Sequence, residues 1–282
     1  MSIVVTGATG KLGHHVVEQL LEKVPSGQIT AVVRDREKAA AFAARGVKIA
    51  VADYNAPETF DGLFTTGDKV LLISGSEEGR VVQHKTVIDA AKAAGVALLA
   101  YTSAPGSLRS ALADDHRSTE QVVIASGLPY VMLRNAWYNE NYTEQLAPTL
   151  EQGAVVQAAG QGRVASAARA DYAAAAVAVL TGEGHAYKTY ELSGDTAWSF
   201  AEYADEIGRQ TGKEVTYTPV AVGTYSAMLT GLGIPEPVAE MIAGVDQAIE
   251  HGELGVIDGV LSGLINRPTT PIADSISAAL KG

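Results

Sequence analysis

The stretch TGATGKLG, residues 6–13, constrains the fold of this 282-residue chain more than any other feature. Its glycines stand at positions 7, 10 and 13, directly after the apolar residues 3–5. From Val16 to Val24 apolar residues recur at three- and four-residue spacing, which predicts a helix. A strand, a glycine-rich turn and a helix in this order open a βαβ unit, and such a turn presents helix N–H groups to a phosphate.

Short apolar runs alternate with helical segments through the first half of the chain. We predict helices over 37–45 and 81–94, and strands over 3–5, 29–33, 47–51, 69–74, 96–103 and 129–134. These runs are apolar throughout rather than alternating, which is typical of a parallel sheet buried on both faces. The predicted fold class is therefore α/β, a Rossmann-type doubly wound parallel sheet.

The second half of the chain is less regular. Residues 153–166 could form two short strands around a glycine-rich turn, and 187–194 have strand character. Asp171 is expected to cap a helix that runs to residue 180, and Ser199 with Glu202 fits a capping box before a helix over 200–210.

The last part, 220–282, predicts short helices, with Pro271 at the start of the final one. We therefore expect a dinucleotide-binding domain at 1–194 and a small, mostly helical substrate lobe at 195–282. Residues 134–152 are expected to contribute to the substrate cleft.

The charge and the absence of cysteine exclude several classes of function. The net charge of −11, from 21 basic and 32 acidic residues, argues against nucleic acid or an anionic membrane as the main partner. With no cysteine there is no disulfide, thiolate catalysis or cysteine-bound metal. Neither HxxxH nor HExxH spacing occurs, so we predict no metal site.

The N-terminus carries no basic segment followed by a long apolar one, so no signal peptide is expected. The longest apolar stretches, such as 172–180, are too short to span a bilayer. These features predict a cytoplasmic protein. A monomer or a homodimer is expected.

Each glycine of the loop has a predicted role. Gly7 permits the tight turn, Gly10 lets the backbone approach a pyrophosphate, and Gly13 lets the helix pack close to the strand. The alternative is a plain strand–helix turn. The predicted cofactor loop comprises Gly7, Thr9, Gly10, Lys11, Leu12 and Gly13.

The end of the second predicted strand reads VVRDRE and bears on which dinucleotide binds. Arg34 lies 21 positions after Gly13, and a guanidinium there suits the 2′-phosphate of NADPH. Asp35 beside it is a carboxylate that could serve NADH. We predict NADPH, with NADH as the alternative, and a surface charge is the other interpretation of Arg34.

Further cofactor contacts are predicted at the ends of later strands. Asp53 ends the third strand, beside the adenine, although a turn-forming Asp is an equal alternative. Ser74 and Gly75 follow the fourth strand, where small residues allow the dinucleotide to approach closely. Thr102 follows the fifth strand, near the nicotinamide ribose.

Several motifs resemble a known group. They are TGATGKLG, VVRDREKA, ADY at 52–54, LLISGSE at 71–77, AYTS at 100–103, LRNAWYNENY at 133–142 and ARADYAAAA at 168–176. Together they resemble the NmrA-like branch of the atypical short-chain dehydrogenases, in the subgroup of type 2 NAD(P)H:quinone oxidoreductases and triphenylmethane reductases. The likeness covers nearly the whole chain and weakens over the last 60 residues.

Typical short-chain dehydrogenases use Tyr-x-x-x-Lys as an acid–base pair. In the corresponding stretch ADDHRSTEQ, His116 takes the place of the tyrosine and Glu120 that of the lysine. A glutamate would raise the pKa of its partner rather than lower it, which argues against ketone reduction by the usual route. Reduction of a quinone depends less on such an acid–base pair, and His116, with a pKa near neutrality, could supply a proton. The alternative is a partly buried or surface histidine on a helix.

The residues after the sixth strand are the candidates for catalysis and substrate binding. Asn135 could bond a carboxamide or a substrate oxygen, and Trp137 and Tyr138 could stack on a flat acceptor, with Tyr138 also a catalytic candidate. Asn139 and Arg169 complete the predicted substrate site. The alternative is packing between the two lobes.

Three functions fit these features. The first is an NADPH-dependent oxidoreductase that transfers hydride to a quinone or similar conjugated aromatic, without flavin or metal. The second is a regulatory protein that senses NAD(P)H without catalysis, which the missing Tyr–Lys pair also fits. The third is a tailoring oxidoreductase on a polycyclic aromatic natural product.

Overall fold

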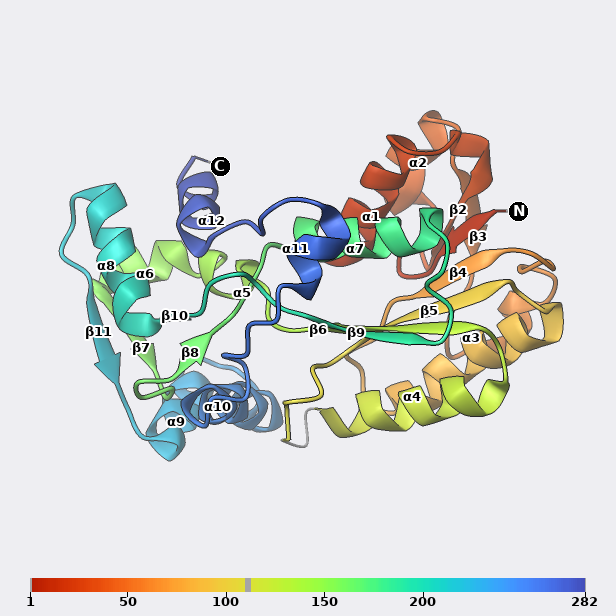
Figure 1. The fold of residues 1–282 in the computed structure, drawn as a ribbon. Coiled ribbons are helices and arrows are strands. Elements are labelled where there is room, and N and C mark those ends of the chain that lie inside the picture. The colour runs from red at the N-terminus through yellow and green to blue at the C-terminus, as the bar shows by residue number, and fades with distance from the viewer. Residues whose placement is uncertain (1, 110–112, 282) are drawn as a thin grey trace. The chain divides into compact units, whose positions relative to one another are not determined.

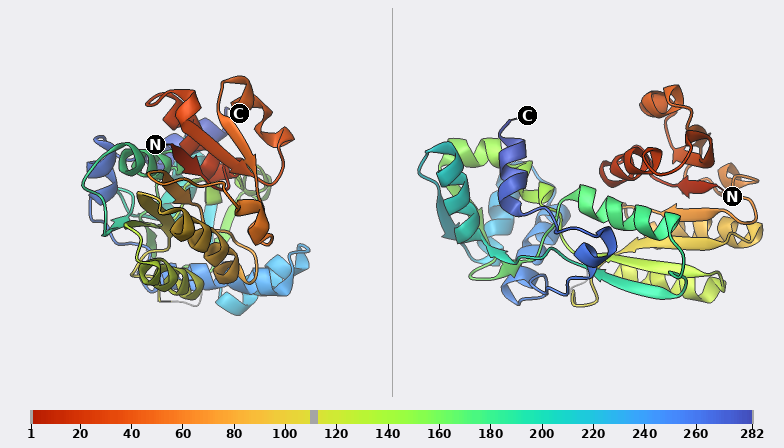
Figure 2. Two further views of the ribbon diagram at one scale, coloured as in Figure 1. Left: turned by 90° about the vertical axis from the view of Figure 1, so that its right-hand side faces the viewer. Right: turned by 45° about the horizontal axis from the view of Figure 1, so that its top comes forward.

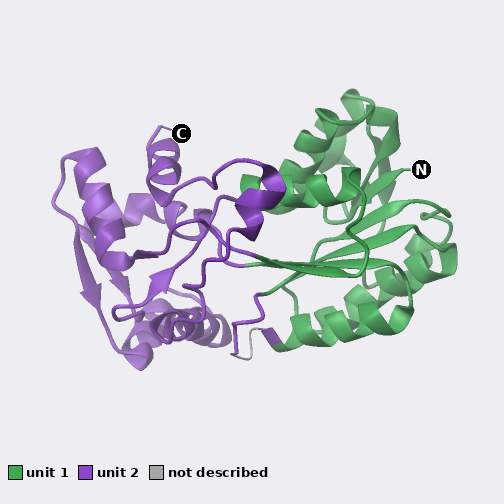
Figure 3. Cartoon of the chain, viewed as in Figure 1, with its two compact units in different colours: residues 1–104, 114–135, 169–191 green, residues 105–113, 136–168, 192–282 purple. Residues whose placement is uncertain are grey.

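A computed structural model describes residues 2–109 and 113–281 (Figure 1). The chain forms two compact units (Figure 3). Unit 1 comprises residues 1–104, 114–135 and 169–191, and unit 2 comprises 105–113, 136–168 and 192–282.

This division differs from the single boundary at 194 that the sequence suggested. Residues 136–168 belong to unit 2, because their strands pair with C-terminal strands. Within the seven-stranded sheet, the strand before this segment lies beside the strand that follows it.

Unit 1 is built on a seven-stranded sheet with the order β3-β2-β1-β4-β5-β6-β9. The strands are β1 (Ile3–Val5), β2 (Ile29–Val33), β3 (Lys48–Val51), β4 (Lys69–Leu72), β5 (Leu98–Ser103), β6 (Tyr130–Asn135) and β9 (Lys188–Leu192). The pairs from β3 through to β6 are parallel, with Val5 opposite Ala31 on one side and Leu71 on the other. The predicted Rossmann-type sheet is thereby confirmed. The strand order reverses between β1 and β4, which is where such folds bind their ligands.

Helices cover both faces of this sheet. They are α1 (Lys11–Leu21), α2 (Ala40–Ala44), α3 (Arg80–Ala94), α4 (Asp114–Ser126) and α7 (Arg169–Thr181), with short 3₁₀ turns at Ser26–Gln28, Glu37–Ala39 and Pro57–Phe60. Figure 2 shows α3 and α4 together on one face, and α1 packs on α7 on the other. The core under α3 and α4 contains Ile88, Leu99, Val123 and Met132. Burial of these apolar side chains on both faces explains why the central strands read as continuous apolar runs.

The start of α7 departs from the expectation. Asp171 was expected at the N-cap, but α7 begins at Arg169, so Asp171 lies in the first turn and is fully buried. A carboxylate in the first turn still faces the positive end of the helix dipole. The sequence therefore predicted this helix correctly but placed its first residue too late in the chain.

Unit 2 contains short strands and helices. They are α5 (Glu140–Thr143), α6 (Leu146–Gln152), β7 (Ala154–Gln157), β8 (Arg163–Val164), β10 (Trp198–Ser199), α8 (Phe200–Thr211), β11 (Thr216–Pro219), α9 (Val222–Gly231), α10 (Glu236–Glu250), α11 (Val260–Ile265) and α12 (Ile272–Ala279). The two predicted strands within 153–166 exist but do not pair with each other. β7 pairs in parallel with β11, and β8 pairs antiparallel with β10.

The cap of α8 is the one predicted in the sequence. The Ser199 hydroxyl accepts a hydrogen bond from the Glu202 backbone N–H, and the Glu202 carboxylate accepts one from the Ser199 N–H. Pro271 stands at the N-cap of α12, as expected for the start of the last helix. None of the helices in the described ranges 2–109 and 113–281 has the length and apolar character to cross a membrane.

Candidate functional site

A cavity of about 420 Å³ lies in unit 1 at the carboxyl ends of β1, β2, β3 and β4. Its volume falls within the range of small-molecule sites, about 300–1,000 Å³. It is lined by Gly7, Thr9, Gly10, Val32, Val33, Arg34, Asp35, Lys38, Ala52, Asp53, Tyr54, Asn55, Ile73, Ser74, Gly75, Ser76, Glu77 and Gln83. The cavity therefore stands at the reversal of the strand order and brings together most of the predicted cofactor residues.

The glycine loop forms one wall of this cavity. Gly7 has a φ of +60°, a conformation that L side chains rarely adopt. The Gly10 N–H donates to the Gly7 carbonyl at 2.9 Å, and this bond closes the turn. A Cβ on Gly13 would lie 2.2 Å from the Gly7 carbonyl oxygen, so only glycine lets α1 pack this close to the loop. The geometry matches the roles predicted for Gly7 and Gly13.

The N-terminus of α1 follows the loop directly. Gly10 is the N-cap and no side chain caps the helix, nor does an acidic residue lie in its first turn. The positive end of the helix dipole is therefore left for an anion. Lys11 is exposed and Leu12 is buried, and neither lines the cavity, in contrast to Thr9.

Charged side chains line the same cavity as the glycine loop. Arg34 and Lys38 are the cations, and Asp35, Asp53 and Glu77 are the anions. Two of the acids are engaged in local turns, since Asp35 Oδ1 accepts from the Glu37 N–H and Asp53 Oδ1 accepts from the Asn55 N–H, each at 2.9 Å. Asp53 thus makes a turn, which was one of its two predicted roles, and it also borders the cavity.

Several residues that line the cavity were not predicted from the sequence. Lys38 lies in the 3₁₀ turn Glu37–Ala39, four positions after Arg34, and a second cation this close to Arg34 in the sequence could have identified it. Tyr54 joins two strand ends, because its hydroxyl bonds Thr6 Oγ1 and the Ile73 carbonyl. Gln83 and Asn55 carry no local sequence signal, since the topology alone brings α3 and the end of β3 to the cavity.

Ser74 and Gly75 line the cavity as predicted, whereas Thr102 lies behind them. The Thr102 hydroxyl is buried and accepts the Ser74 N–H at 2.9 Å, so it holds the segment after β4 in place. The Gly75 N–H donates to His84 Nε2 at 2.9 Å, and His84 Nδ1 lies 2.9 Å from the Thr119 hydroxyl. Because Nε2 accepts a hydrogen bond, the imidazole of His84 carries its proton on Nδ1.

His116 has a different chemical state from the one expected. Its Nδ1 lies 2.9 Å from the Tyr101 hydroxyl. Burial, with a smaller contribution from the nearby Arg80 cation, lowers the pKa of His116 to about 4. Burial also raises the pKa of Tyr101 well above its usual range, so the phenol keeps its proton. A pKa near neutrality was expected for His116, and the structure corrects this: the ring is neutral at pH 7.

The hydrogen bonds of Glu120 are made to Arg134 and Ser103, although its charge also acts to raise the pKa of His116, as the sequence predicted. Its carboxylate accepts from Arg134 Nε at 2.8 Å, from Arg134 Nη2 at 2.7 Å and from the Ser103 hydroxyl at 2.7 Å. Arg134 also donates to Glu191 at 2.8 Å. Although burial opposes ionisation, the bonds from Arg134 and Ser103 hold the pKa of Glu120 below its usual range. Glu120 therefore joins α4 to β5 and β6.

The depressed pKa of His116 predicts a pH-dependent stability. An unfolded histidine takes up a proton near pH 6.5 and the folded one only near pH 4, so the contribution of His116 is fully present above pH 6.5 and is lost as the pH falls toward 4. When the pH is lowered from 7.5 to 5.5, the titration of His116 should reduce the free energy of unfolding by about 1 kcal/mol.

Urea unfolding of the wild type and of His116→Asn at the two pH values measures this contribution. Other titrating groups, including Asp246, whose burial raises its pKa to about 7, cancel in the comparison. The wild type should lose about 1 kcal/mol more than the variant. Equal losses in the two proteins would show that His116 titrates normally.

The remaining predicted residues stand near the end of β6 and the start of α7. Asn135 is the last residue of β6 and Arg169 the first of α7, and both are buried. Trp137 and Tyr138 belong to unit 2, where their backbones pair with Ala167. None of these four lines the cavity of unit 1.

Asn139 has a structural role in unit 2. It is fully buried, and its Nδ2 donates to the Thr270 carbonyl at 3.0 Å and to Ser275 Oγ at 2.9 Å. Its Oδ1 accepts the Ser166 hydroxyl at 2.6 Å. Because the whole amide is engaged, it is not placed to bind a substrate as the sequence suggested.

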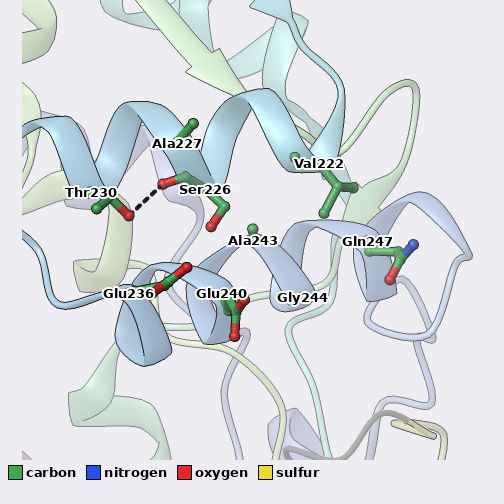
Figure 4. Close-up of a pocket in the computed structure, with 10 residues that line it drawn as sticks. Val222, Ser226, Ala227, Thr230, Glu236, Glu240, Ala243, Gly244 and Gln247 are labelled. Carbon is green, nitrogen blue, oxygen red and sulfur yellow. Dashed lines mark hydrogen bonds between the residues drawn. The ribbon is translucent and has the colours of Figure 1, made fainter.

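A second cavity, of about 630 Å³, lies within unit 2 between α9 and α10 (Figure 4). Glu236, Glu240 and Gln247 border it from α10, and Ser226 and Thr230 from α9. The Thr230 hydroxyl donates to the Ser226 carbonyl within α9. This cavity contains none of the residues predicted from the sequence.

The cavity of unit 1 fits a dinucleotide. It combines a glycine loop at an uncapped helix N-terminus, which suits a pyrophosphate, with two cations at the end of β2, which suit a further phosphate. Among the described residues, 2–109 and 113–281, no three His, Cys, Asp or Glu side chains gather as a metal site would require. The arrangement is that of a nucleotide site.

Comparisons with known proteins agree with this geometry. A family described as NAD(P)H-binding matches residues 7–183. The chain is 46% identical to quinone oxidoreductase 2 of Escherichia coli, over 98% of this chain and 97% of that protein. The crystal structure of the E. coli NADPH-dependent quinone oxidoreductase with NADPH superposes with a TM-score of 0.95 at 45% identity, covering 99% of each chain.

The structure of Citrobacter sp. triphenylmethane reductase with NADP(H) gives a TM-score of 0.94 at 40% identity, covering 99% of this chain and 100% of that one. The resemblance that the sequence motifs indicated is thus confirmed over the whole length. The chain belongs to the NAD(P)H-binding family, in its NmrA-like group.

Proposed function

We propose that this protein is an NADPH-dependent reductase that passes hydride to a quinone or a similar conjugated aromatic acceptor. One observation carries the choice of NADPH: Arg34 and Lys38 line the same cavity as the glycine loop. The similarity to E. coli quinone oxidoreductase 2 supports the class of acceptor. The cytoplasmic location and a monomeric or dimeric state stay expectations from the sequence.

In this proposal unit 1 holds the cofactor with its own backbone and side chains. The loop from Gly7 to Gly10 contacts the pyrophosphate, and Arg34 with Lys38 binds the 2′-phosphate. Asp53 lies toward the adenine, and Ser74 with Gly75 allows close approach at the middle of the dinucleotide. NADPH, when bound, supplies the hydride.

The neutral state of His116 suits an acceptor that needs no strong acid. A quinone is electron-poor, and its reduced anion is stabilised by aromaticity. In this proposal Tyr101 donates to Nδ1 and the neutral ring carries its proton on Nε2, so the imidazole offers a hydrogen bond rather than an imidazolium proton. We include His116 as this donor, with Asn135 and Tyr138 as further catalytic candidates. Stacking of the acceptor on Trp137 and Tyr138, and the place of Arg169 beside it, are part of the same proposal.

The first test is the optical oxidation of NADPH with benzoquinone and with naphthoquinone, run in parallel with NADH. Quinone-dependent turnover that favours NADPH supports the proposal. Tight NADPH binding without turnover on any acceptor would replace it with a sensor of the dinucleotide.

Replacing Arg34 with glutamine should lower the affinity for NADPH about tenfold and leave that for NADH nearly unchanged. A charge-assisted hydrogen bond to phosphate is worth about 1.5–3 kcal/mol, and the exposure of Arg34 reduces this. Dissociation constants for both cofactors measure the effect.

The matched control is Arg36→Gln. Arg36 is also exposed and carries the same charge, but it donates to the Ile49 carbonyl and does not line the cavity. If Arg34→Gln weakens NADPH and NADH equally, Arg34 does not recognise the 2′-phosphate.

A further inference from the structure

Glu77 is an acidic residue of the cavity, and it contacts Arg34, the residue that is proposed to bind the 2′-phosphate. Arg34 Nη1 donates to Glu77 Oε1 at 2.9 Å. The other two acids of the cavity, Asp35 and Asp53, accept hydrogen bonds from nearby backbone N–H groups instead. The carboxylate of Glu77 therefore already engages Nη1 of Arg34, one of the guanidinium donors that a phosphate could use.

The position of Glu77 is fixed by a buried side chain on a different element. Gln83, on α3, is 8% exposed, and its Nε2 lies 3.3 Å from Glu77 Oε2 and 3.1 Å from Asn55 Oδ1. Both carboxylate oxygens of Glu77 are thus engaged, one by Arg34 and one by Gln83. A chain of hydrogen bonds, Arg34–Glu77–Gln83–Asn55, joins the segments after β2, β4 and β3 along the cavity wall.

This arrangement has a consequence for a 2′-phosphate. A phosphate bound to the Arg34 guanidinium would bring its negative charge within about 4–6 Å of the Glu77 carboxylate, where like charges oppose each other. A ribose with a free 2′-hydroxyl brings no such charge. A carboxylate at position 77 should therefore weaken the binding of ligands that carry the 2′-phosphate and leave the binding of ligands without it unchanged.

We propose that Glu77 is a specificity-determining residue, which competes with the 2′-phosphate for Arg34 and so limits the preference for NADPH over NADH. This inference rests on the proposed use of NADPH. It adds a residue that weakens the binding of the preferred cofactor, NADPH. The physical effect is moderate, because the Arg34 and Glu77 side chains are 69% and 53% exposed and solvent screens their charges.

The test compares two fragments of the cofactor that differ only in the phosphate, adenosine 2′,5′-bisphosphate and adenosine 5′-monophosphate. Calorimetric titration of Glu77→Gln should show the bisphosphate bound about three- to fivefold more tightly than by the wild type. The affinity of the variant for the monophosphate should lie within about 1.5-fold of that of the wild type, because this ligand brings no 2′-phosphate charge near position 77. The gain for the bisphosphate should shrink at high salt.

The matched control is Glu78→Gln, which removes the same charge from an exposed neighbour that does not line the cavity. It should leave both affinities unchanged. The proposal is overturned if Glu77→Gln changes both ligands equally, changes neither, or weakens the bisphosphate, since a loss would mean that Glu77 orients Arg34 for the phosphate.

Titration of the wild type with NADPH and NADH separates the two proposals. If the wild type binds neither cofactor, the proposed function fails and the role of Glu77 fails with it. If the wild type binds NADPH but Glu77→Gln leaves the ratio of the two fragment affinities unchanged, only the role of Glu77 fails.

Discussion

Replacing Gly13 with alanine is expected to weaken dinucleotide binding about a hundredfold and to lower the unfolding free energy by about 1–3 kcal/mol. A Cβ at this position would lie 2.2 Å from the Gly7 carbonyl oxygen and 2.8 Å from the Ala8 Cα. Both are backbone atoms, so the contact is relieved only when the loop and α1 move apart. That movement displaces the same backbone that is proposed to contact the pyrophosphate.

Two further alanine variants are expected to have smaller effects than Gly13→Ala. At Gly27 a Cβ would meet no atom within 4 Å, so Gly27→Ala should change stability by less than about 0.5 kcal/mol and leave binding intact. At Gly10 the Cβ would lie 3.1 Å from the Gly7 oxygen, so we expect an intermediate loss of stability together with weaker binding. Urea unfolding and NADPH titration measure both effects. Wild-type binding in Gly13→Ala would refute the assignment of the loop.

Replacing Glu120 with alanine should destabilise unit 1 by about 2–4 kcal/mol. The carboxylate is buried and accepts three hydrogen bonds, two from Arg134 and one from Ser103. Its removal leaves the Arg134 guanidinium, which is only 26% exposed, with Glu191 as its remaining acidic contact among those described here. Taking one partner from a buried pair is costly because the other charge loses its compensation.

The matched control is Asp89→Ala, which breaks the exposed pair between Lys85 and Asp89 within α3. This change should cost less than about 0.5 kcal/mol, since exposed pairs contribute little. Urea unfolding at neutral pH compares the two variants. Losses of similar size would show that the Glu120 network is no stronger than a surface pair.

The sheet was predictable because its information is local. Each central strand is a short apolar run, and burial on both faces requires such runs whatever the rest of the chain does. The conformation of Gly7 and the close packing at Gly13 follow from residue type in the same way. The capping box of Ser199 and Glu202 needs two residues three positions apart, so the sequence alone contains it.

The roles of individual polar residues were less predictable. Asn139 was expected to bind a substrate, but Ser166, Thr270 and Ser275, which are distant in sequence, engage its amide. Glu120 was expected to pair with His116, and its charge does act on His116, but its carboxylate forms its hydrogen bonds with Arg134 from β6 and with Ser103 from β5. A polar side chain bonds whichever groups the fold brings near, and neither case has a local signal.

The sequence by itself determined the α/β class, the glycine-rich turn before α1 and the family, because hydrophobic pattern and glycine sterics act over a few neighbouring residues. Only the tertiary structure decided the protonation of His116 and the engagement of Arg34. The pKa of His116 falls through burial that packing creates, and Arg34 meets Glu77 from a segment 43 positions away. Charges and hydrogen bonds depend on distance and solvent exposure in three dimensions, and neither is fixed before the chain folds.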